Sequence, residues 1–365
     1  MSNNKSYKNQ SNTNADAKEE PISSLKFRHF LWILFLIVLC NLFFFPINKT
    51  IISHKVDSKG DSYSYDSLVQ KMNISHPKVI LLGNSMVGNG INIEYFTNLT
   101  KTATYILYVG GSESAWWYLA FKNIICKSKN HIPTVALFFR DNELTDPTYR
   151  VTGSFKPRID MLCDSNEPVL DHLAYFNRMA DFDFMLNSYW PLYQKKDSIK
   201  RKIDVFIKEK TAAYFLNMSC NDLDGAIKTV FADTNMNKEI FTKYQFKIDQ
   251  NASSEFDFKR NVNSSFLPQI ISLAKQNNIK LLFVRVKKRR DLLPNSQPPE
   301  ILAYIHDLSE YFKKLNITFI DFTNNKNIKE KDYTEGDHLD NRNPPMTFTK
   351  LVADTLPQFY LKTNY

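Results

Sequence analysis

Five short apolar runs, separated by segments with helical periodicity, constrain the fold of this chain more than any other feature of its sequence. They are continuous rather than alternating, which is typical of parallel strands covered by helices on both faces. The runs are Val79–Leu82, Thr104–Val109, Thr134–Phe139, Lys280–Val286 and Ile317–Asp321. Helical patterns occur at Ile93–Leu99, Glu113–Cys126, Phe258–Gln276 and Glu300–Leu315, and after Pro345. This alternation predicts an α/β domain over residues 78–365, with one parallel sheet of about five strands.

One long interval, from about 146 to 255, interrupts the alternation. It is rich in Tyr, Phe, Asp and Lys and contains no clear strand. Its position between the third and fourth strands predicts a mostly helical insertion. Structural padding is the default interpretation, and a lid or a partner-docking surface are the alternatives.

The N-terminal part of the chain has the composition of a tail followed by a membrane anchor. Residues 1–29 are mostly Asn, Ser, Lys and Glu and are expected to be disordered. Phe30–Ile47 then contains no charge over about the length needed to cross a bilayer, and Lys26 and Arg28 before it favour a cytoplasmic N-terminus. A cleaved signal peptide is the alternative, but Phe-Phe-Phe-Pro is a poor cleavage site. We expect a single-pass anchor in the lipid bilayer, a linker over 48–77 and an extracytoplasmic domain.

The charge of the chain favours acidic partners but not nucleic acid. The formal net charge is +9, yet no nucleic-acid-binding motif is present. A basic run, Lys287–Arg290, directly follows the fourth strand and could grip an anionic glycan, a phosphate-rich polymer or lipid headgroups; a solvated loop is the favoured interpretation. The four cysteines include no Cys-x-x-Cys pair, which argues against a zinc site.

The candidate functional residues follow the strands, where open parallel sheets bind ligands. The first strand leads into Gly83-Asn84-Ser85, a small flexible turn that can present the Ser85 hydroxyl at the start of a helix. The second is followed by Gly111, whose backbone N–H can point into the same cleft. The third is followed by Arg140 and Asn142, which could stabilise a developing negative charge.

A polar loop near the C-terminus supplies the groups that a nucleophilic serine needs. His338 lies there beside two carboxylates, Glu335 and Asp337. A serine is activated by a base, and the base is oriented by an acid. The sequence therefore predicts Ser85 as nucleophile, His338 as base, and Glu335 or Asp337 as the orienting acid.

This set of motifs resembles the SGNH (GDSL-like) hydrolase superfamily. Gly83-Asn84-Ser85 is similar to its first block, Gly111 to the glycine of its second, and His338 to the histidine of its last. Asn142 is the nearest match to the asparagine of the third block. The chain departs from the family pattern in having Asn84 where Asp is usual, Glu335 where an Asp precedes the histidine, and no Gly-x-Asn-Asp in the third block.

The resemblance implies a three-layer, flavodoxin-like fold and a serine-dependent activity. It is strongest to the membrane-anchored branch that includes the teichoic-acid D-alanylation protein D family and the alginate O-acetyltransferase proteins. It therefore implies an esterase or acyl transferase that acts on a cell-surface glycan or related anionic polymer, with an acyl donor delivered by a multi-span membrane partner. No metal or dissociable cofactor is expected. The alternative is a catalytically inactive accessory protein of envelope polymer biogenesis that keeps the fold and binds a polymer or membrane partner.

Overall fold

A parallel sheet of five strands forms the centre of the domain in this computed structural model. The structure describes residues 65–176, 181–190, 254–333, 337–342 and 346–360, with isolated helical residues between 31 and 39 and between 193 and 210. The chain divides into two units, Met1–Lys55 and Val56–Tyr365, and the sheet belongs to the second. The strands are β1 (Val79–Gly83), β2 (Thr104–Tyr108), β3 (Thr134–Phe139), β4 (Lys280–Arg285) and β5 (Thr318–Asp321). The prediction of one parallel sheet of five strands is confirmed.

The order of the strands in space is β2-β1-β3-β4-β5. The two central strands β1 and β3 are buried along their whole length, as their unbroken apolar runs predict. The outer strands β2 and β5 are only partly buried, because each has a neighbour on one side. All four pairings are parallel, so the five strands end at the same edge of the sheet.

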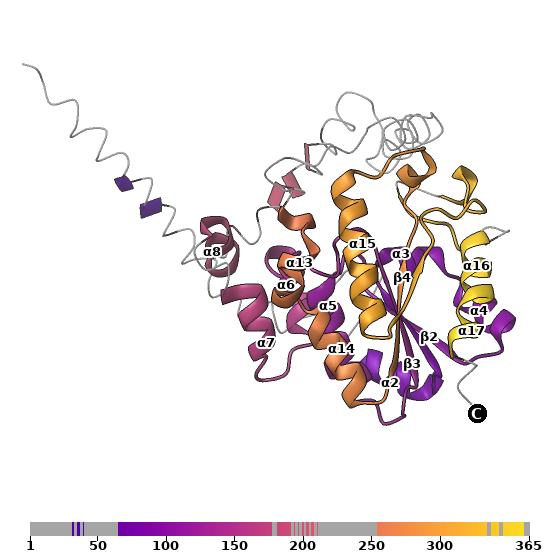
Figure 1. Ribbon diagram of the computed structural model, residues 1–365. Coiled ribbons are helices and arrows are strands. Elements are labelled where there is room, and N and C mark those ends of the chain that lie inside the picture. The colour runs from indigo at the N-terminus through magenta and orange to yellow at the C-terminus, as the bar shows by residue number, and fades with distance from the viewer. Residues whose placement is uncertain are drawn as a thin grey trace, which may run out of the picture. The chain divides into compact units, whose positions relative to one another are not determined.

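Helices cover both faces of the sheet and produce three layers (Figure 1). One face carries α2 (Tyr65–Ser75), α5 (Ser114–Leu119), its π-helical continuation η1 (Ala120–Ile125), α14 (Leu267–Gln276) and α15 (Pro299–Lys314). The other face carries α3 (Ser85–Gly90), α4 (Ile93–Thr100) and α16 (Thr347–Thr355), and α17 (Pro357–Tyr360) follows α16.

The helices adopt these positions because their apolar residues recur at helical spacing. In α14 the buried residues are Leu267, Ile270, Ile271 and Ala274, a single stripe that faces the sheet. In α15 the corresponding stripe is Ile301, Tyr304, Leu308 and Phe312. Each stripe contributes to the core on its side of the sheet.

Two regions differ in detail from the organisation expected from the sequence. Helix α2 lies inside the range 48–77 that was expected to be a linker, and its Leu68 and Met72 are buried in the core. Between β3 and β4, the described part of the insertion consists of short helices. They are η2 (Gly153–Phe155), α6 (Lys156–Asp160), α7 (Pro168–Leu170), η3 (Asp171–Tyr175), α8 (Phe182–Tyr189), α13 (Phe258–Asn261) and η6 (Val262–Ser264). Because Ile159 and Leu162 are buried in the same core, the first part of the insertion is integral to the domain.

The expected membrane anchor, 30–47, lies almost entirely outside the described residues, as does the tail before it. No helix within the described ranges is long and apolar enough to cross a membrane.

Candidate active site

Ser85 and His338 meet at the carboxyl edge of the sheet. Ser85 is the first residue of α3 and directly follows the turn after β1. His338 lies 253 residues further along the chain, and its Nε2 atom is 3.0 Å from the Ser85 Oγ atom. A serine hydroxyl within hydrogen-bonding distance of an imidazole nitrogen is the arrangement in which the imidazole can accept the hydroxyl proton during attack.

The turn that presents Ser85 depends on Gly83. A Cβ atom at this position would lie 2.6 Å from Cγ2 of Val87 and 3.1 Å from the carbonyl oxygen of Phe138. The close approach of α3 to β1 and β3 therefore requires a residue without a side chain. This packing places the Ser85 hydroxyl at the rim, where it stays partly exposed to solvent.

The loop carrying His338 is tied to helix α3 by Asn341. Its Nδ2 atom donates hydrogen bonds to the carbonyl oxygens of Gly88, at 2.8 Å, and Ile91, at 3.0 Å. Leu339 is fully buried and pairs with Tyr333 in an antiparallel bridge. Asn341 therefore helps to hold the His338 loop beside Ser85, a role that its position three residues after His338 did not reveal.

Asn84 holds the turn that carries Ser85 in place. Its Oδ1 atom accepts a hydrogen bond from the backbone N–H of Met86 at 3.0 Å and so caps α3. Its Nδ2 atom donates to the buried carboxylate of Glu143, at 3.2 and 3.3 Å from the two oxygens. An aspartate at this position could cap the helix but could not donate to Glu143. The structure thus gives a physical reason for the asparagine at a position where the resembling family usually has aspartate.

Glu143 also binds Arg140, and Arg140 in turn binds Asp337. The backbone N–H, Nε and Nη2 of Arg140 donate to the Glu143 carboxylate at 2.8, 3.1 and 3.0 Å. The Nη1 atom donates to Oδ2 of Asp337 at 3.2 Å. Burial would lower the pKa of the Arg140 guanidinium, but Glu143 and Asp337 outweigh burial and raise that pKa, so the group stays charged.

The result is a chain of hydrogen bonds, Asn84–Glu143–Arg140–Asp337, which we call the bridge. It joins the residue before Ser85 to the residue before His338. Arg140 was expected to face an oxyanion, but the structure directs three of its nitrogen atoms to carboxylates instead. Glu143 was not among the predicted site residues, although it belongs to the polar run after β3 that includes Arg140 and Asn142.

Of the two candidate orienting acids, Glu335 and Asp337, the structure describes only Asp337. Glu335 lies outside the described residues. Both oxygens of Asp337 are engaged, because Oδ1 accepts the backbone N–H of Arg289 at 2.5 Å and Oδ2 accepts Arg140. Asp337 thus anchors its loop to two neighbouring segments.

The turn after β2 lies against Ser85. A Cβ atom at Gly110 would be 3.9 Å from the Ser85 Cβ, and Gly111 adopts a positive φ of 71° that favours glycine. The backbone N–H groups of Ser85, at the start of α3, and of Gly111 are the candidate oxyanion donors. Asn142 is placed differently from the expectation, because its Nδ2 atom donates to the carbonyl oxygen of Glu255 at 3.4 Å.

The basic run Lys287–Arg290 is not the solvated loop that the sequence favoured. Lys287, Lys288 and Arg289 are buried, with exposed fractions of 6%, 5% and 8%. Lys288 and Arg290 bind the carboxylate of Asp141, Arg289 binds Glu330, and Lys287 donates to a backbone carbonyl. Burial alone would raise the pKa of the Asp141 carboxyl, but Lys288, Arg290 and Arg285 lower it. Three of the four cations are therefore paired with carboxylates and the fourth with a backbone carbonyl, because buried cations require partners.

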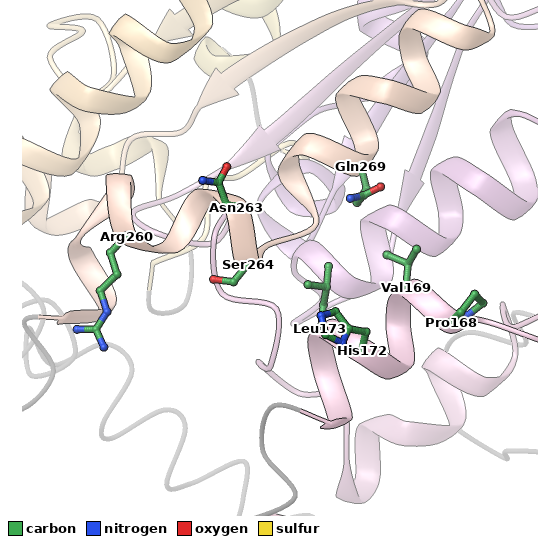
Figure 2. A pocket seen from close by; sticks show the side chains of 8 residues that line it. All are labelled: Pro168, Val169, His172, Leu173, Arg260, Asn263, Ser264 and Gln269. Atoms are coloured by element: carbon green, nitrogen blue, oxygen red, sulfur yellow. The ribbon is translucent and has the colours of Figure 1, made fainter.

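A separate cavity in the described part of the chain shares no residue with the Ser85–His338 pair (Figure 2). Its volume is about 520 Å³, and it opens between α7–η3 and the segment from α13 to α14. Its lining residues are Pro168, Val169, His172, Leu173, Arg260, Asn263, Ser264 and Gln269. We base the candidate site on the Ser85–His338 geometry and not on cavity size, because none of these side chains is paired as nucleophile and base. The described residues contain no cluster of three or more His, Cys, Asp or Glu that could hold a metal ion.

Comparison with solved structures finds similarities at low sequence identity. A candidate acylhydrolase from Bacteroides fragilis matches with 14% identity and a TM-score of 0.35, over 82% of this chain and 97% of that one. A GDSL-like lipase from Bacteroides thetaiotaomicron matches with 11% identity and a TM-score of 0.35, over 80% of this chain and 96% of that one. No family model and no curated protein sequence matches the chain.

Proposed function

We propose that this protein is a serine-dependent esterase or acyl transferase of the SGNH type. The observation that carries the proposal is the 3.0 Å separation of Ser85 Oγ and His338 Nε2. The two residues come from opposite ends of the domain, and the bridge and Asn341 hold their loops together. Such support is what a nucleophile and its base require to keep a productive geometry.

The proposed reaction has two steps. Ser85 Oγ attacks the carbonyl carbon of an ester while His338 Nε2 takes its proton, and the backbone N–H groups of Ser85 and Gly111 stabilise the oxyanion. The carbon–oxygen bond to the alcohol then breaks, and the leaving oxygen takes the proton from His338. Water, or the hydroxyl of an acceptor, attacks the acyl-serine in the same way and regenerates free Ser85. No metal or cofactor takes part in this scheme.

The substrate that we propose is an acylated cell-surface glycan or a related envelope polymer. The support is the charge-free run Phe30–Ile47, which would anchor the domain outside the cytoplasm, and the resemblance to anchored envelope proteins. A multi-span membrane protein that delivers the acyl group is part of the same proposal. Protease added to intact cells should digest the domain and spare the N-terminal tail. Protection of the C-terminus would contradict this topology.

The activity is tested on purified protein with a chromogenic acetate ester and a serine-reactive phosphonate. We expect hydrolysis and stoichiometric labelling, and we expect Ser85→Ala and His338→Ala each to abolish hydrolysis. Because residues that act as one unit are not additive, the double variant should be no worse than either single one. Ser272→Ala, at an exposed serine of α14, is the matched control and should behave as wild type. Full activity in Ser85→Ala would refute the proposal and favour an accessory protein without catalysis.

A further inference from the structure

The insertion between β3 and β4 carries more than half of the exposed large apolar side chains that the structure describes beyond position 64. There are eleven such side chains, and six of them lie between positions 176 and 207. They are Phe176, Phe182, Met185, Ile203, Phe206 and Ile207. Single apolar side chains scattered over a surface are ordinary, but their concentration in one segment indicates an interaction surface.

The last three of these side chains belong to a segment with helical backbone. The structure describes nine residues between positions 193 and 210, and all nine are helical. They are Tyr193, Lys196, Ile199, Lys200, Lys202, Ile203, Phe206, Ile207 and Lys210. The exposed fractions of Ile203, Phe206 and Ile207 are 52%, 58% and 55%, so more than half of each side chain is left uncovered.

Seven of the nine residues share one face of a helix. At about 100° per residue they fall within an arc of about 120°. This face, which we call the lysine-flanked face, consists of Lys196, Ile199, Lys200, Ile203, Phe206, Ile207 and Lys210. Its centre is apolar. Lys196 and Lys210 lie about one turn before and after the apolar centre, and Lys200 borders it.

Two of the lysines in this segment lie over aromatic rings. Nζ of Lys210 is 5.6 Å from the ring centroid of Phe206, and Nζ of Lys196 is 3.6 Å from that of Tyr193. Both lysines are exposed. A lysine in this position covers apolar surface with its hydrocarbon stem and keeps its ammonium group in water. At a bilayer the same arrangement places the ammonium groups at the level of the headgroups and the apolar side chains below them.

The charge of the segment favours a bilayer over a protein as the partner. Residues 193–210 include seven Lys or Arg residues and three Asp or Glu residues. Lysine is depleted in protein–protein interfaces, whereas lysine beside exposed Phe and Ile is typical of helices that lie on an anionic bilayer. The charge-free run Phe30–Ile47, as the anchor proposed above, would keep the domain close to such a surface.

We propose that the lysine-flanked face binds the surface of a bilayer that contains anionic lipid, with Ile203, Phe206 and Ile207 inserted at the headgroup boundary. The insertion thereby provides a second contact with the membrane, separate from the anchor, and holds the domain against the bilayer. This inference goes beyond the proposed function, because it uses neither Ser85 nor His338.

The test measures amide hydrogen exchange of the full-length protein in lipid nanodiscs. One preparation contains phosphatidylcholine alone, and the other contains phosphatidylcholine mixed with phosphatidylglycerol. We expect peptides from 193–210 to exchange roughly tenfold or more slowly in the anionic nanodiscs, because binding stabilises their helical hydrogen bonds. Added NaCl should reduce this difference. Peptides from α15 should exchange equally in both preparations, and equal exchange of 193–210 would overturn the inference.

Substitution of the apolar centre tests the contact itself. Ile203→Ser/Phe206→Ser should abolish the slow exchange in anionic nanodiscs. It should leave the midpoint of urea unfolding unchanged, because both side chains are exposed. Leu302→Ser, at an exposed position of α15, is the matched control and should keep the wild-type difference. Persistence of slow exchange in the double serine variant would overturn the inference.

A triple lysine variant tests the charge. Lys196→Gln/Lys200→Gln/Lys210→Gln should make peptides from 193–210 exchange alike in the two preparations. The control variant, Lys275→Gln/Lys313→Gln/Lys314→Gln, removes the same charge from exposed positions elsewhere and should keep the difference. An equal loss in both variants would show that the effect follows net charge, and would overturn the assignment to this face.

Two further outcomes separate this inference from its alternatives. Slow exchange of 193–210 in native membrane vesicles but not in anionic nanodiscs would assign the face to a protein partner and overturn the inference. Slow exchange of Phe30–Ile47 alone would overturn it as well and leave the anchor intact. Hydrolysis of a soluble acetate ester should be the same in the triple lysine variant and in wild type, so failure of the esterase proposal would be seen independently.

Discussion

Arg140 donates a hydrogen bond from Nη1 to Oδ2 of Asp337, the residue directly before His338, across 3.2 Å. The two residues are separated by 197 positions in the sequence. Because Arg140 also binds Glu143, and Glu143 binds Asn84, this contact completes a connection between the segments that carry the candidate nucleophile and base.

Arg140→Gln should impair both stability and catalysis. It leaves Glu143 and Asp337 without their shared cation. Loss of one partner from a fully buried pair destabilises by about 3 to 5 kcal/mol, and the partial exposure of Arg140 and Asp337 should reduce this cost. We expect a lower midpoint in urea unfolding and a fall in kcat that exceeds any change in KM, because the two loops lose their alignment. The matched control is Lys259→Gln, which removes a pair between Lys259 and Asp307 at the surface and should leave both measurements unchanged. Equal stability of Arg140→Gln and wild type would contradict a structural role for the bridge.

Asn84→Asp should destabilise the domain although aspartate caps helices as well as asparagine. The new carboxylate would face the buried carboxylate of Glu143 at the position where Asn84 Nδ2 now donates. Combining it with Glu143→Gln should restore part of the loss, since an amide at position 143 can donate to an aspartate. The measurement is a double-mutant cycle on the free energy of unfolding. Additive effects would show that the contact contributes nothing, and Asn327→Asp, at an exposed position, controls for the added charge.

Glu335→Gln should lower turnover more than Asp337→Asn. Both oxygens of Asp337 already accept hydrogen bonds from Arg140 and Arg289, so its substitution should act through the position of the loop. If Glu335 orients His338, its loss should reduce kcat by roughly three to four powers of ten, as when the acid of a catalytic triad is replaced. The pH dependence of kcat should change with Glu335→Gln, because an orienting acid stabilises the imidazolium. The opposite ranking would identify Asp337 as the orienting acid.

Glu113→Gln should stabilise the protein increasingly as pH rises. Burial raises the pKa of Glu113 well above its usual 4.5; Glu143 and Asp146 add to this, and Arg140 and Arg150 oppose it. Above about pH 4.5 the unfolded chain has therefore lost the Glu113 proton that the folded protein still holds. The free energy of unfolding falls as pH rises from there toward the folded-state pKa. The substitution removes this loss. Thermal unfolding should show a gain for Glu113→Gln near pH 8 that shrinks toward pH 4, whereas Glu300→Gln, at the surface, should show no such trend.

The sequence by itself determined the five strands, several of the helices that cover them and two of the candidate residues. Hydrophobic periodicity is a local property, so the five apolar runs identified the strands, and the stripe in α14 identified a helix. Because residues that follow parallel strands lie at one edge of the sheet, the sequence alone indicated Ser85 as a site residue. The polar loop with a histidine beside two carboxylates indicated His338, and the structure brings these two side chains together.

Tertiary structure alone decided which partners the polar residues have. The sequence could not show that Arg140 binds Glu143 and Asp337, or that Lys288 is buried against Asp141. Nor could it show that Arg150 and Arg158 stack on Phe155 beside the Ser85 turn. A local pattern shows that a residue is polar, but its hydrogen-bond partner depends on which distant segments the fold brings together. Burial determines whether a charged group needs a partner within the protein. A charged group that loses its hydration must be paired, whereas a charged group at the rim stays hydrated and available to a ligand.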